Sequence, residues 1–224
     1  MSDVAVPEYM TKYYRRAYVR PWAVRFFDRQ VCVNLILSGN YNRLRDLTLR
    51  ALGERLPGRT LQIACCYGNL TPHVVERVVQ GGGSLDVIDV LQIQLDRLAS
   101  KLPSEAPVSL TRMDSSALSM QDATYDRVFM FFLTHEQPPE YRKRTVAEAL
   151  RVLKPGGRIV IADYAQHVWW HPLKPYLLLV SYLKPFVRDV WKHPLSELLP
   201  AMRTTTWPRS SCFGGLFQVL VSEK

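Results

Sequence analysis

Short hydrophobic runs alternate with segments of helical periodicity through the middle of the chain. The runs are almost wholly apolar, which is typical of strands buried on both faces of a parallel sheet, and the intervening segments place apolar residues every three or four positions. The pattern predicts strands at 61–66, 85–89, 108–113, 127–133 and 158–162, and helices within 71–79, 91–98 and 141–153. Strands that alternate with helices form right-handed βαβ units, so the sequence predicts an α/β fold with a parallel sheet.

The predicted strands all end in glycine or polar residues. The five ends carry Tyr67-Gly68, Asp89, Asp114, His135-Glu136 and Asp163. Ligands of parallel sheets bind beyond the carboxyl ends of the strands, so these residues are candidates for one site. Gly68 lets a ligand approach the backbone closely, and Asp89 can accept both hydroxyls of a ribose. Because the turn at Gly68 lacks a complete G-x-G-x-x-G pattern, a nucleoside without phosphates fits better than a dinucleotide.

Length and charge divide the chain into a core and two basic flanks. The 224 residues suit one folded domain with additions. The net charge of +9 is made up of +6 for 1–60, −1 for 61–166 and +4 for 167–224. We predict a basic helical segment facing substrate or membrane at 1–57, the core at 58–166, and a lid with the last strands of the sheet at 167–224. A basic flank can meet nucleic acid or an anionic membrane surface.

Aromatic residues are concentrated in both flanks. Near the N-terminus they recur at every fourth position, as Tyr14, Tyr18, Trp22 and Phe26, although Pro21 should break or restart a helix there. In the last part of the chain, aromatic residues such as Trp169 and Trp170 are interleaved with basic ones. This mixture suits a membrane interface, and it equally suits an apolar lid with a charged rim. The longest charge-free apolar run there, 175–183, is too short to cross a bilayer.

Four segments resemble the class I S-adenosylmethionine (SAM)-dependent methyltransferases. They are 61–68 for the first strand and its turn, 87–90 for the ribose acid, 113–117 for the acid on the adenine side, and 148–157 for the helix and turn before the fifth strand. The resemblance implies a Rossmann-like sheet with SAM as co-substrate, and helical N-terminal and C-terminal additions that form a substrate lid. The cofactor contacts that it implies are Gln62, Ala64, Tyr67, Gly68, Asp89, Val90, Asp114, Ser115 and Ser116.

The first segment departs from that family's pattern in two places. Gln62 stands where the family normally has Asp or Glu, and Cys66-Tyr67-Gly68 replaces a Gly-x-Gly turn. With these departures, the chain resembles the rhodoquinone-biosynthesis (RquA) family over nearly its full length, through segments 13–18, 25–30, 132–138 and 212–217. This second resemblance implies that ubiquinone is the substrate and that an amino group replaces a ring methoxy group. It further implies SAM as the amino donor and manganese as the metal.

An amino-donor role for SAM would account for the altered first segment. The methionyl amine must be neutral to attack a ring carbon, and an amide at Gln62 removes a negative charge that would favour the ammonium form. Tyr67 follows in the same turn, close to the expected methionyl end, and could reposition the amine or take part in proton transfer. The candidate catalytic residues are therefore Tyr67 and His135.

Metal and substrate contacts are expected from the strand ends and the N-terminal flank. His135, Glu136 and Asp163 are the candidate ligands, because imidazole and carboxylates suit manganese, which could polarise a quinone carbonyl. A hydrogen-bonding or acid-base role for His135 is an equal alternative. The residues expected to contact the substrate are Tyr14, Tyr18, Trp22, Phe26 and Phe132.

Three other functions fit parts of the pattern. A conventional methyltransferase acting on a quinone or another lipophilic acceptor would make a methylated product. A nucleic-acid-binding module would need one basic stripe with stacking aromatics, which the near-neutral core does not favour. A non-catalytic scaffold protein would explain the altered glycine turn.

A lipid-quinone substrate also bears on location and partners. We expect peripheral association with an anionic membrane, on the cytoplasmic side of the inner membrane of a bacterium or in the matrix of a mitochondrion, and no nucleic-acid partner. No oligomeric state is predicted.

Overall fold

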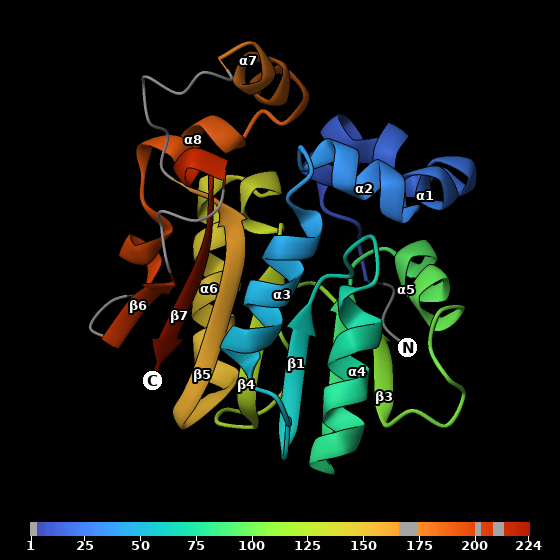
Figure 1. Ribbon diagram of the computed structural model, residues 1–224, viewed down its shortest axis with the longest axis vertical. Coiled ribbons are helices and arrows are strands. Elements are labelled where there is room, and N and C mark those ends of the chain that lie inside the picture. The colour runs from blue at the N-terminus through green and yellow to red at the C-terminus, as the bar shows by residue number, and fades with distance from the viewer. Residues whose placement is uncertain (1–3, 166–173, 200–202, 208–212) are drawn as a thin grey trace.

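A single sheet of seven strands organises the protein. The computed structural model describes residues 4–165, 174–199, 203–207 and 213–224, of which 15–19, 174–176, 203–207 and 213 are described by their backbone (Figure 1). The sheet order is β3-β2-β1-β4-β5-β7-β6. The strands are β1 (Arg59–Ile63), β2 (Ser84–Asp89), β3 (Val108–Arg112), β4 (Tyr125–Phe131), β5 (Leu153–Tyr164), β6 (Arg203–Trp207) and β7 (Phe217–Glu223). Strands β1 to β5 are parallel and β7 is antiparallel to both of its neighbours, so the predicted parallel α/β sheet is confirmed.

The central strands are buried along most of their length, as their apolar sequences predict. Val128 of β4 pairs with Ile159 of β5, and both side chains are completely buried. The strand boundaries differ from the sequence pattern by up to five residues, most at the end of the first strand and at the start of the fifth. The first strand ends at Ile63, because Ala64 takes a φ of +68° and turns the chain away. The fifth begins earlier than predicted, because Leu153 pairs with Tyr125 and a shift in register follows.

Helices cover both faces of the sheet. In Figure 1, α3 (Tyr41–Leu52) and α4 (Leu70–Gly81) lie in front of it, and α6 (Pro139–Val152) lies behind. Helix α5 (Gln92–Ala99) contacts β2 and β3, at the edge of the sheet that β3 forms. One hydrophobic cluster joins these layers, and its largest fully buried side chains include Tyr41, Tyr125 and Phe129. Burial of each such side chain contributes about 1.5–3 kcal/mol to stability.

The additions at both ends of the chain lie at the carboxyl ends of the parallel strands (Figure 1). From the N-terminal part come the π-helix η1 (Met10–Val19), α1 (Pro21–Phe27) and α2 (Gln30–Ile36), which we call the roof. Pro21 occupies the first turn of α1 and restarts the helix there, as the sequence predicts. From the C-terminal part come α7 (Lys174–Leu183), α8 (Val187–Lys192) and the short 3₁₀ turns η3 (Leu195–Leu198) and η4 (Phe213–Gly215). A further 3₁₀ turn, η2 (Thr134–Glu136), lies in the core between β4 and α6.

Some predicted features lie outside the described parts of the chain. Trp169, Trp170 and Cys212 are outside the described residues, and the side chain of Tyr18 is not described. Within the described ranges, none of the helices has both the length and the apolar character needed to cross a bilayer.

Candidate active site

A cavity of about 480 Å³ lies between the strand ends and the roof. This volume falls within the roughly 300–1,000 Å³ that is usual for small-molecule sites. Residues at the strand ends or just after them, among them Tyr67, Asp89 and His135, form one side. Residues of the roof, such as Tyr14 and Ile36, form the other. The cavity therefore lies where the sequence predicts a ligand to bind.

Gln62 braces the turn after β1 from inside the protein. Its buried amide donates from Nε2 to the carbonyl oxygen of Ala64 (3.1 Å), and its Oε1 accepts the hydroxyl of Thr71 (3.0 Å). Ala64 lines the cavity, whereas Gln62 lies behind it. A carboxylate at this position would face the Ala64 carbonyl oxygen, so the amide stabilises this particular turn.

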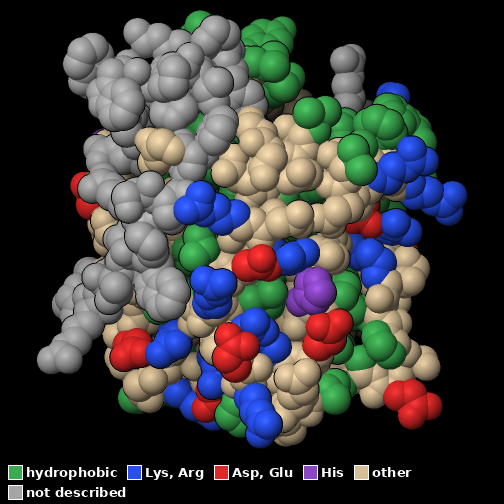
Figure 2. All heavy atoms as spheres, in the orientation of Figure 1, with side chains coloured by type: hydrophobic (Ala, Val, Ile, Leu, Met, Phe, Trp, Pro, Cys, Tyr) green, Lys and Arg blue, Asp and Glu red, His purple; other side chains and the backbone are tan. Residues whose placement is uncertain are grey.

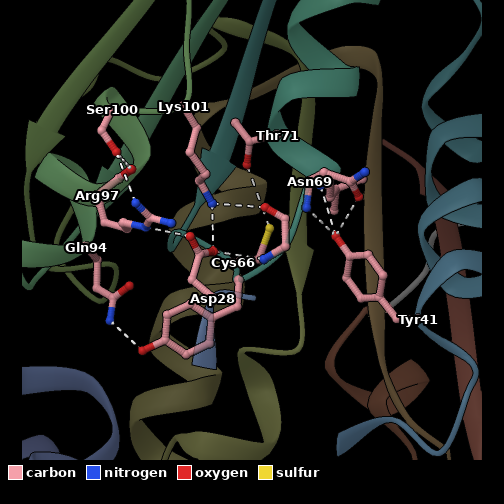
Figure 3. Close-up of polar contacts among 12 residues, drawn as sticks. Asp28, Tyr41, Cys66, Asn69, Thr71, Gln94, Arg97, Ser100 and Lys101 are labelled. Atoms are coloured by element: carbon pink, nitrogen blue, oxygen red, sulfur yellow. Dashed lines mark hydrogen bonds and ion pairs between the residues drawn. The ribbon is translucent and has the colours of Figure 1, made fainter. Parts of the chain in front are cut away.

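Gly68 is packed against the phenol of Tyr41, which comes from α3 (Figure 3). Gly68 has a φ of +87°, and a Cβ built there would lie 2.6 Å from Tyr41 Cζ. The Tyr41 hydroxyl also accepts the N–H groups of Asn69 (2.8 Å) and Leu70 (3.0 Å) at the start of α4. Only glycine permits this approach, so Gly68 is required by the shape of the turn.

Asp89 ends β2 with its carboxylate fixed at the cavity wall. Oδ2 accepts the N–H of Cys65 (2.8 Å) and Oδ1 accepts the N–H of Leu91 (2.8 Å). Burial raises the pKa of Asp89 to about 6, although these two N–H groups oppose the rise. Asp89 is therefore ionised at neutral pH and can accept further hydrogen bonds from a ligand. Val90, the next residue, also lines the cavity.

Tyr67 presents a protonated phenol to the cavity. Gln94 of α5 donates from Nε2 to the Tyr67 hydroxyl (3.1 Å). Burial raises the pKa of Tyr67 above its ordinary value, mainly because a phenolate would lose its hydration there. Tyr67 can therefore donate a hydrogen bond or a proton to a bound molecule at neutral pH.

The end of β3 is tied to α6 by hydrogen bonds. Asp114 accepts the N–H of Ser116 (2.7 Å) and the hydroxyl of Tyr141. The hydroxyl of Ser115 lies 2.9 Å from that of Thr145. Ser115 and Tyr141 line the cavity, and Asp114 and Ser116 lie behind them. Asp114 thus holds the phenol of Tyr141 in place at the cavity wall, where a ligand would contact it.

His135, in the turn after β4, is held by Asp163 at the end of β5. Its Nδ1 is 2.8 Å from Asp163 Oδ1, and Asp163 also accepts the hydroxyl of Thr134 (2.6 Å) and the N–H of Tyr164 (2.7 Å). Burial alone would raise the pKa of Asp163, but His135 and these hydrogen bonds lower it. The ionised Asp163 accepts a proton-bearing Nδ1, which leaves Nε2 of His135 on the side of Glu136, 3.6 Å from its Oε1.

The predicted metal ligands do not form a cation site. Both oxygens of Asp163 accept hydrogen bonds from the protein, and Glu136 forms an ion pair with Lys184. Across the described residues, no three His, Cys, Asp or Glu side chains are grouped so that they could hold a metal ion. This donor set does not fit a resident manganese ion. We therefore assign Asp163 to the orientation of His135 and not to metal ligation.

The structure brings many of the predicted site residues together. Those that line the cavity are Tyr14, Ala64, Tyr67, Asp89, Val90, Ser115, Phe132, His135 and Glu136. Those behind its wall are Gln62, Gly68, Asp114, Ser116 and Asp163. Trp22 and Phe26 are 62% and 47% exposed on α1 and do not line the cavity, so the expected substrate contact is not found there. The even four-residue spacing fails because η1 is a π-helix and α1 restarts at Pro21.

Further polar residues at the cavity are absent from the strand-end pattern. They are Tyr9, Gln94, Gln137, Tyr141 and Lys184. Gln94 and Tyr141 lie in the first turns of α5 and α6, and the first turn of a helix that follows a strand is a signal that could have found them. Tyr9 and Lys184 reach the cavity from the two flanks, and local sequence gives no such signal for them.

Comparison with known proteins finds similarity to methyltransferases. Residues 60–157 match a family model described as a methyltransferase domain (Methyltransf_25). The ubiquinone/menaquinone biosynthesis C-methyltransferase UbiE of Pseudomonas paraeruginosa is 30% identical over 143 residues, which cover 60% of this chain and 53% of UbiE. The demethylmenaquinone methyltransferase of Renibacterium salmoninarum is 29% identical over 183 residues, which cover 80% of this chain and 66% of that enzyme.

Solved structures agree on the fold. The 1,6-didemethyltoxoflavin-N1-methyltransferase of Burkholderia thailandensis, solved with S-adenosylhomocysteine, has a TM-score of 0.60 at 16% identity and covers 98% of this chain and 91% of its own. Residues 60–157 match the methyltransferase-domain model, and the chain shares the Rossmann-like fold of the solved SAM-dependent methyltransferases, which confirms the predicted fold class. The chain spans about half the length of UbiE.

Proposed function

We propose that this chain binds SAM in the cavity, with the ribose on Asp89 and the methionyl end beside Tyr67. Three observations support this. The methyltransferase-domain match spans both residues. Asp89 ends the second strand, the position from which an acid accepts ribose hydroxyls in such sheets. The B. thailandensis neighbour was solved with the SAM product S-adenosylhomocysteine.

The second substrate in our proposal is ubiquinone. One relative is named as a ubiquinone/menaquinone biosynthesis methyltransferase and another as a demethylmenaquinone methyltransferase, and the cavity offers aromatic side chains for a quinone ring. Phe132 lies edge-on to His135, with ring centroids 5.9 Å apart, and Tyr14 lies across the cavity on the roof. A flat ring held between them would lie beside the catalytic candidates His135 and Tyr67.

The reaction we propose is amino transfer from SAM to the quinone ring, and one observation carries it. Among the described residues that line the cavity, the carboxylates are Asp89 and Glu136. Asp89 accepts two backbone N–H groups, and Glu136 is paired with Lys184. Because Gln62 stands where the family has an acid, a methionyl amine would face an amide there, and the two cavity carboxylates already have protein partners, which favours the neutral amine. A neutral amine is a nucleophile.

The bonds in this reaction balance without an added oxidant. The amine nitrogen bonds to the ring carbon, the bond from that carbon to the methoxy oxygen breaks, and the methoxy group leaves as methanol with one amine proton. Nε2 of His135 can accept this proton, and the phenol of Tyr67 can donate to the leaving oxygen. Release of the free ring amine follows if the quinone takes two electrons and two protons, one from the methionyl carbon and one from the nitrogen, and so becomes a quinol that carries an imine. Water then hydrolyses the imine to the aminoquinol and the keto acid derived from SAM.

Conventional methyl transfer is the second candidate, because the named relatives are methyltransferases. The two reactions are separated by SAM that carries heavy nitrogen at the amine and deuterium in the methyl group. The enzyme is incubated with ubiquinone, or with a demethylated quinol, each with and without manganese, and the quinones are analysed by mass spectrometry. Heavy nitrogen in the quinone is the result expected. A deuterated methyl group without heavy nitrogen would replace amino transfer by methyl transfer.

The affinity for SAM is expected to fall as the pH drops below about 6, the value to which burial raises the pKa of Asp89. Only the ionised carboxylate can accept both ribose hydroxyls while keeping its bonds to Cys65 and Leu91. Below that pKa the ionised fraction falls about tenfold per pH unit, and the affinity falls with it. Calorimetric titration with SAM at several pH values measures this.

Asp89→Asn has the same shape without the charge, so it should bind SAM weakly at every pH and without this dependence. The control is Asp96→Asn on the exposed side of α5, which should keep the wild-type profile. A wild-type affinity that stays constant through this pH range would show that Asp89 does not hold the ribose.

We also propose that the roof and α7 rest on an anionic membrane from which the quinone enters. The exposed apolar side chains described in these helices are Tyr13, Trp22, Phe26, Val31, Leu35, Ile36, Leu178, Leu179, Tyr182 and Leu183. Figure 2 shows hydrophobic side chains over α1, α2 and α7, whereas charged ones dominate the opposite end. Ile36 and Leu183 are both exposed and part of the cavity lining, so the apolar surface continues into the cavity. Arg25 and Arg29 are exposed beside it and suit anionic headgroups.

Leu35→Glu is expected to weaken sedimentation with vesicles of mixed anionic and neutral lipid by about tenfold, because it places a charge in the apolar surface. Leu35 is 77% exposed, so the change should leave the fold intact. Val79→Glu is the matched control, since Val79 is 57% exposed on α4, away from this surface. Equal losses in both variants, or binding that neither high salt nor purely neutral lipid reduces, would contradict the proposed membrane face.

A further inference from the structure

Asp28 connects the roof to the glycine turn (Figure 3). It follows the last residue of α1, and its side chain is 1% exposed. Oδ1 accepts the N–H of Gly68 (3.0 Å) and Nζ of Lys101 (2.8 Å), and Oδ2 accepts Nε of Arg97 (2.6 Å). These residues lie behind the turn and do not line the cavity. The carboxylate therefore acts on the turn from the side opposite to a bound ligand.

This contact fixes the backbone on both sides of Gly68. Asp28 holds its N–H, and Lys101 donates to its carbonyl oxygen (2.9 Å). The N–H of Gly68 belongs to the peptide group that follows Tyr67, so the orientation of that group also sets the direction in which Tyr67 leaves the chain. The hydroxyl of Tyr67 is bound by Gln94 (3.1 Å).

Helix α5 contacts both sides of the glycine turn. Gln94 binds the phenol of Tyr67 on the cavity side, and Arg97, about one turn later in α5, reaches Asp28 behind it. On the other flank, Phe27 precedes Asp28 and lines the cavity from the roof. The position of the roof and the shape of the turn are therefore linked through one buried carboxylate.

Charge makes this link sensitive to the loss of that carboxylate. Two cations, Arg97 and Lys101, share Asp28 as an ion-pair partner. Removal of one member of a buried ion pair leaves its partners uncompensated, which costs more than the loss of a neutral contact. Without the charge of Asp28, the two cations would repel each other directly behind the turn.

We propose that Asp28 is a positioning residue for SAM. Its carboxylate holds the 64–68 turn in place and couples this turn to the roof. The inference deepens the proposed SAM site and rests on it. It gives a role to segment 25–30, which the strand-end pattern leaves without one. Asp28 is expected to affect the binding of SAM without touching it.

The deciding variant is Asp28→Asn, which keeps the size of the side chain and an oxygen for the Gly68 N–H but removes the charge. Calorimetric titration with SAM should show a dissociation constant raised about tenfold, the size of effect expected when one strong polar contact is lost. Adding Arg97→Met to Asp28→Asn should recover at least about half of that loss in free energy, because it removes an uncompensated cation. A purely structural role of Asp28 would lower the melting temperature of the Asp28→Asn variant but leave the dissociation constant of its folded fraction for SAM unchanged.

Asp46→Asn is the matched control, since Asp46 pairs with Arg45 on the exposed side of α3 and should bind SAM as the wild type does. If Asp28→Asn does not fold by circular dichroism, Lys101→Met decides, because it removes the contacts to both Asp28 and Gly68. An unchanged dissociation constant in the deciding variant overturns the role of Asp28 alone. A wild-type protein that does not bind SAM overturns the proposed cofactor site together with this inference.

Discussion

Replacement of Gly68 by alanine is expected to abolish SAM binding and to lower the free energy of unfolding. The added Cβ would overlap Tyr41, lying 2.6 Å from Cζ, and Tyr41 is completely buried and has no room to move. The φ of +87° also disfavours any side chain. Left-handed strain of about 1–2 kcal/mol and overpacking of about 1–3 kcal/mol together predict a loss of roughly 2–5 kcal/mol.

Gly82→Ala isolates the part of this effect that comes from the collision. Gly82 has a φ of +67°, but a Cβ there would meet no atom within 4 Å. Thermal unfolding and SAM titration compare the two variants. Gly82→Ala should lose little stability and bind SAM normally, whereas Gly68→Ala should lose both. If Gly68→Ala bound SAM as tightly as the wild type, the turn after β1 would not be the cofactor site.

His135→Ala should lower the rate of product formation by about 10²–10⁴-fold, the usual contribution of a positioned acid or base. Its side chain is buried beside the cavity and oriented by Asp163 (2.8 Å), so no water could take the same place with the same geometry. The affinity for SAM should change little, because the proposed ribose and methionyl contacts come from other strands. Single-turnover assays with the labelled quinone product, and SAM titrations, measure the two quantities separately.

His193→Ala is the control for a change of charge and size, since His193 is 66% exposed on the C-terminal side of α8. It should retain the wild-type rate. A His135→Ala variant with more than about one tenth of the wild-type rate would exclude His135 as an acid or base and leave it a packing role against Phe132 and Tyr164.

The strands and the edge of the sheet that carries the site could be predicted because both depend on local sequence. Central parallel strands must be apolar on both faces, and the residues that follow them converge at one edge whatever the loops do. For this reason Tyr67, Asp89 and His135 were found from the pattern and lie at one cavity. The strand limits at Ile63 and Leu153 were not, because they depend on one backbone angle and on a shift in pairing.

The contacts that were missed join residues far apart in sequence. Asp28 and Gly68 are separated by 40 positions, and Glu136 and Lys184 by 48. Nothing in the local pattern around Asp28 distinguishes a buried carboxylate from a solvated one at a helix end. For Gln62, the substitution itself was visible, but its role in bracing the turn from behind depends on Thr71, which lies in the next helix.

The phenol of Tyr41 has a consequence for which adenine nucleotides this protein can hold. The first N–H groups of a helix after a glycine turn form an anion site, which proteins that bind NAD or ATP use for phosphate. Here a neutral hydroxyl already accepts the N–H groups of Asn69 and Leu70, and the N–H of Gly68 is taken by a carboxylate. A diphosphate would find its donors occupied and a negative charge behind them. The start of α4 therefore disfavours phosphorylated nucleotides, which agrees with the proposed binding of SAM.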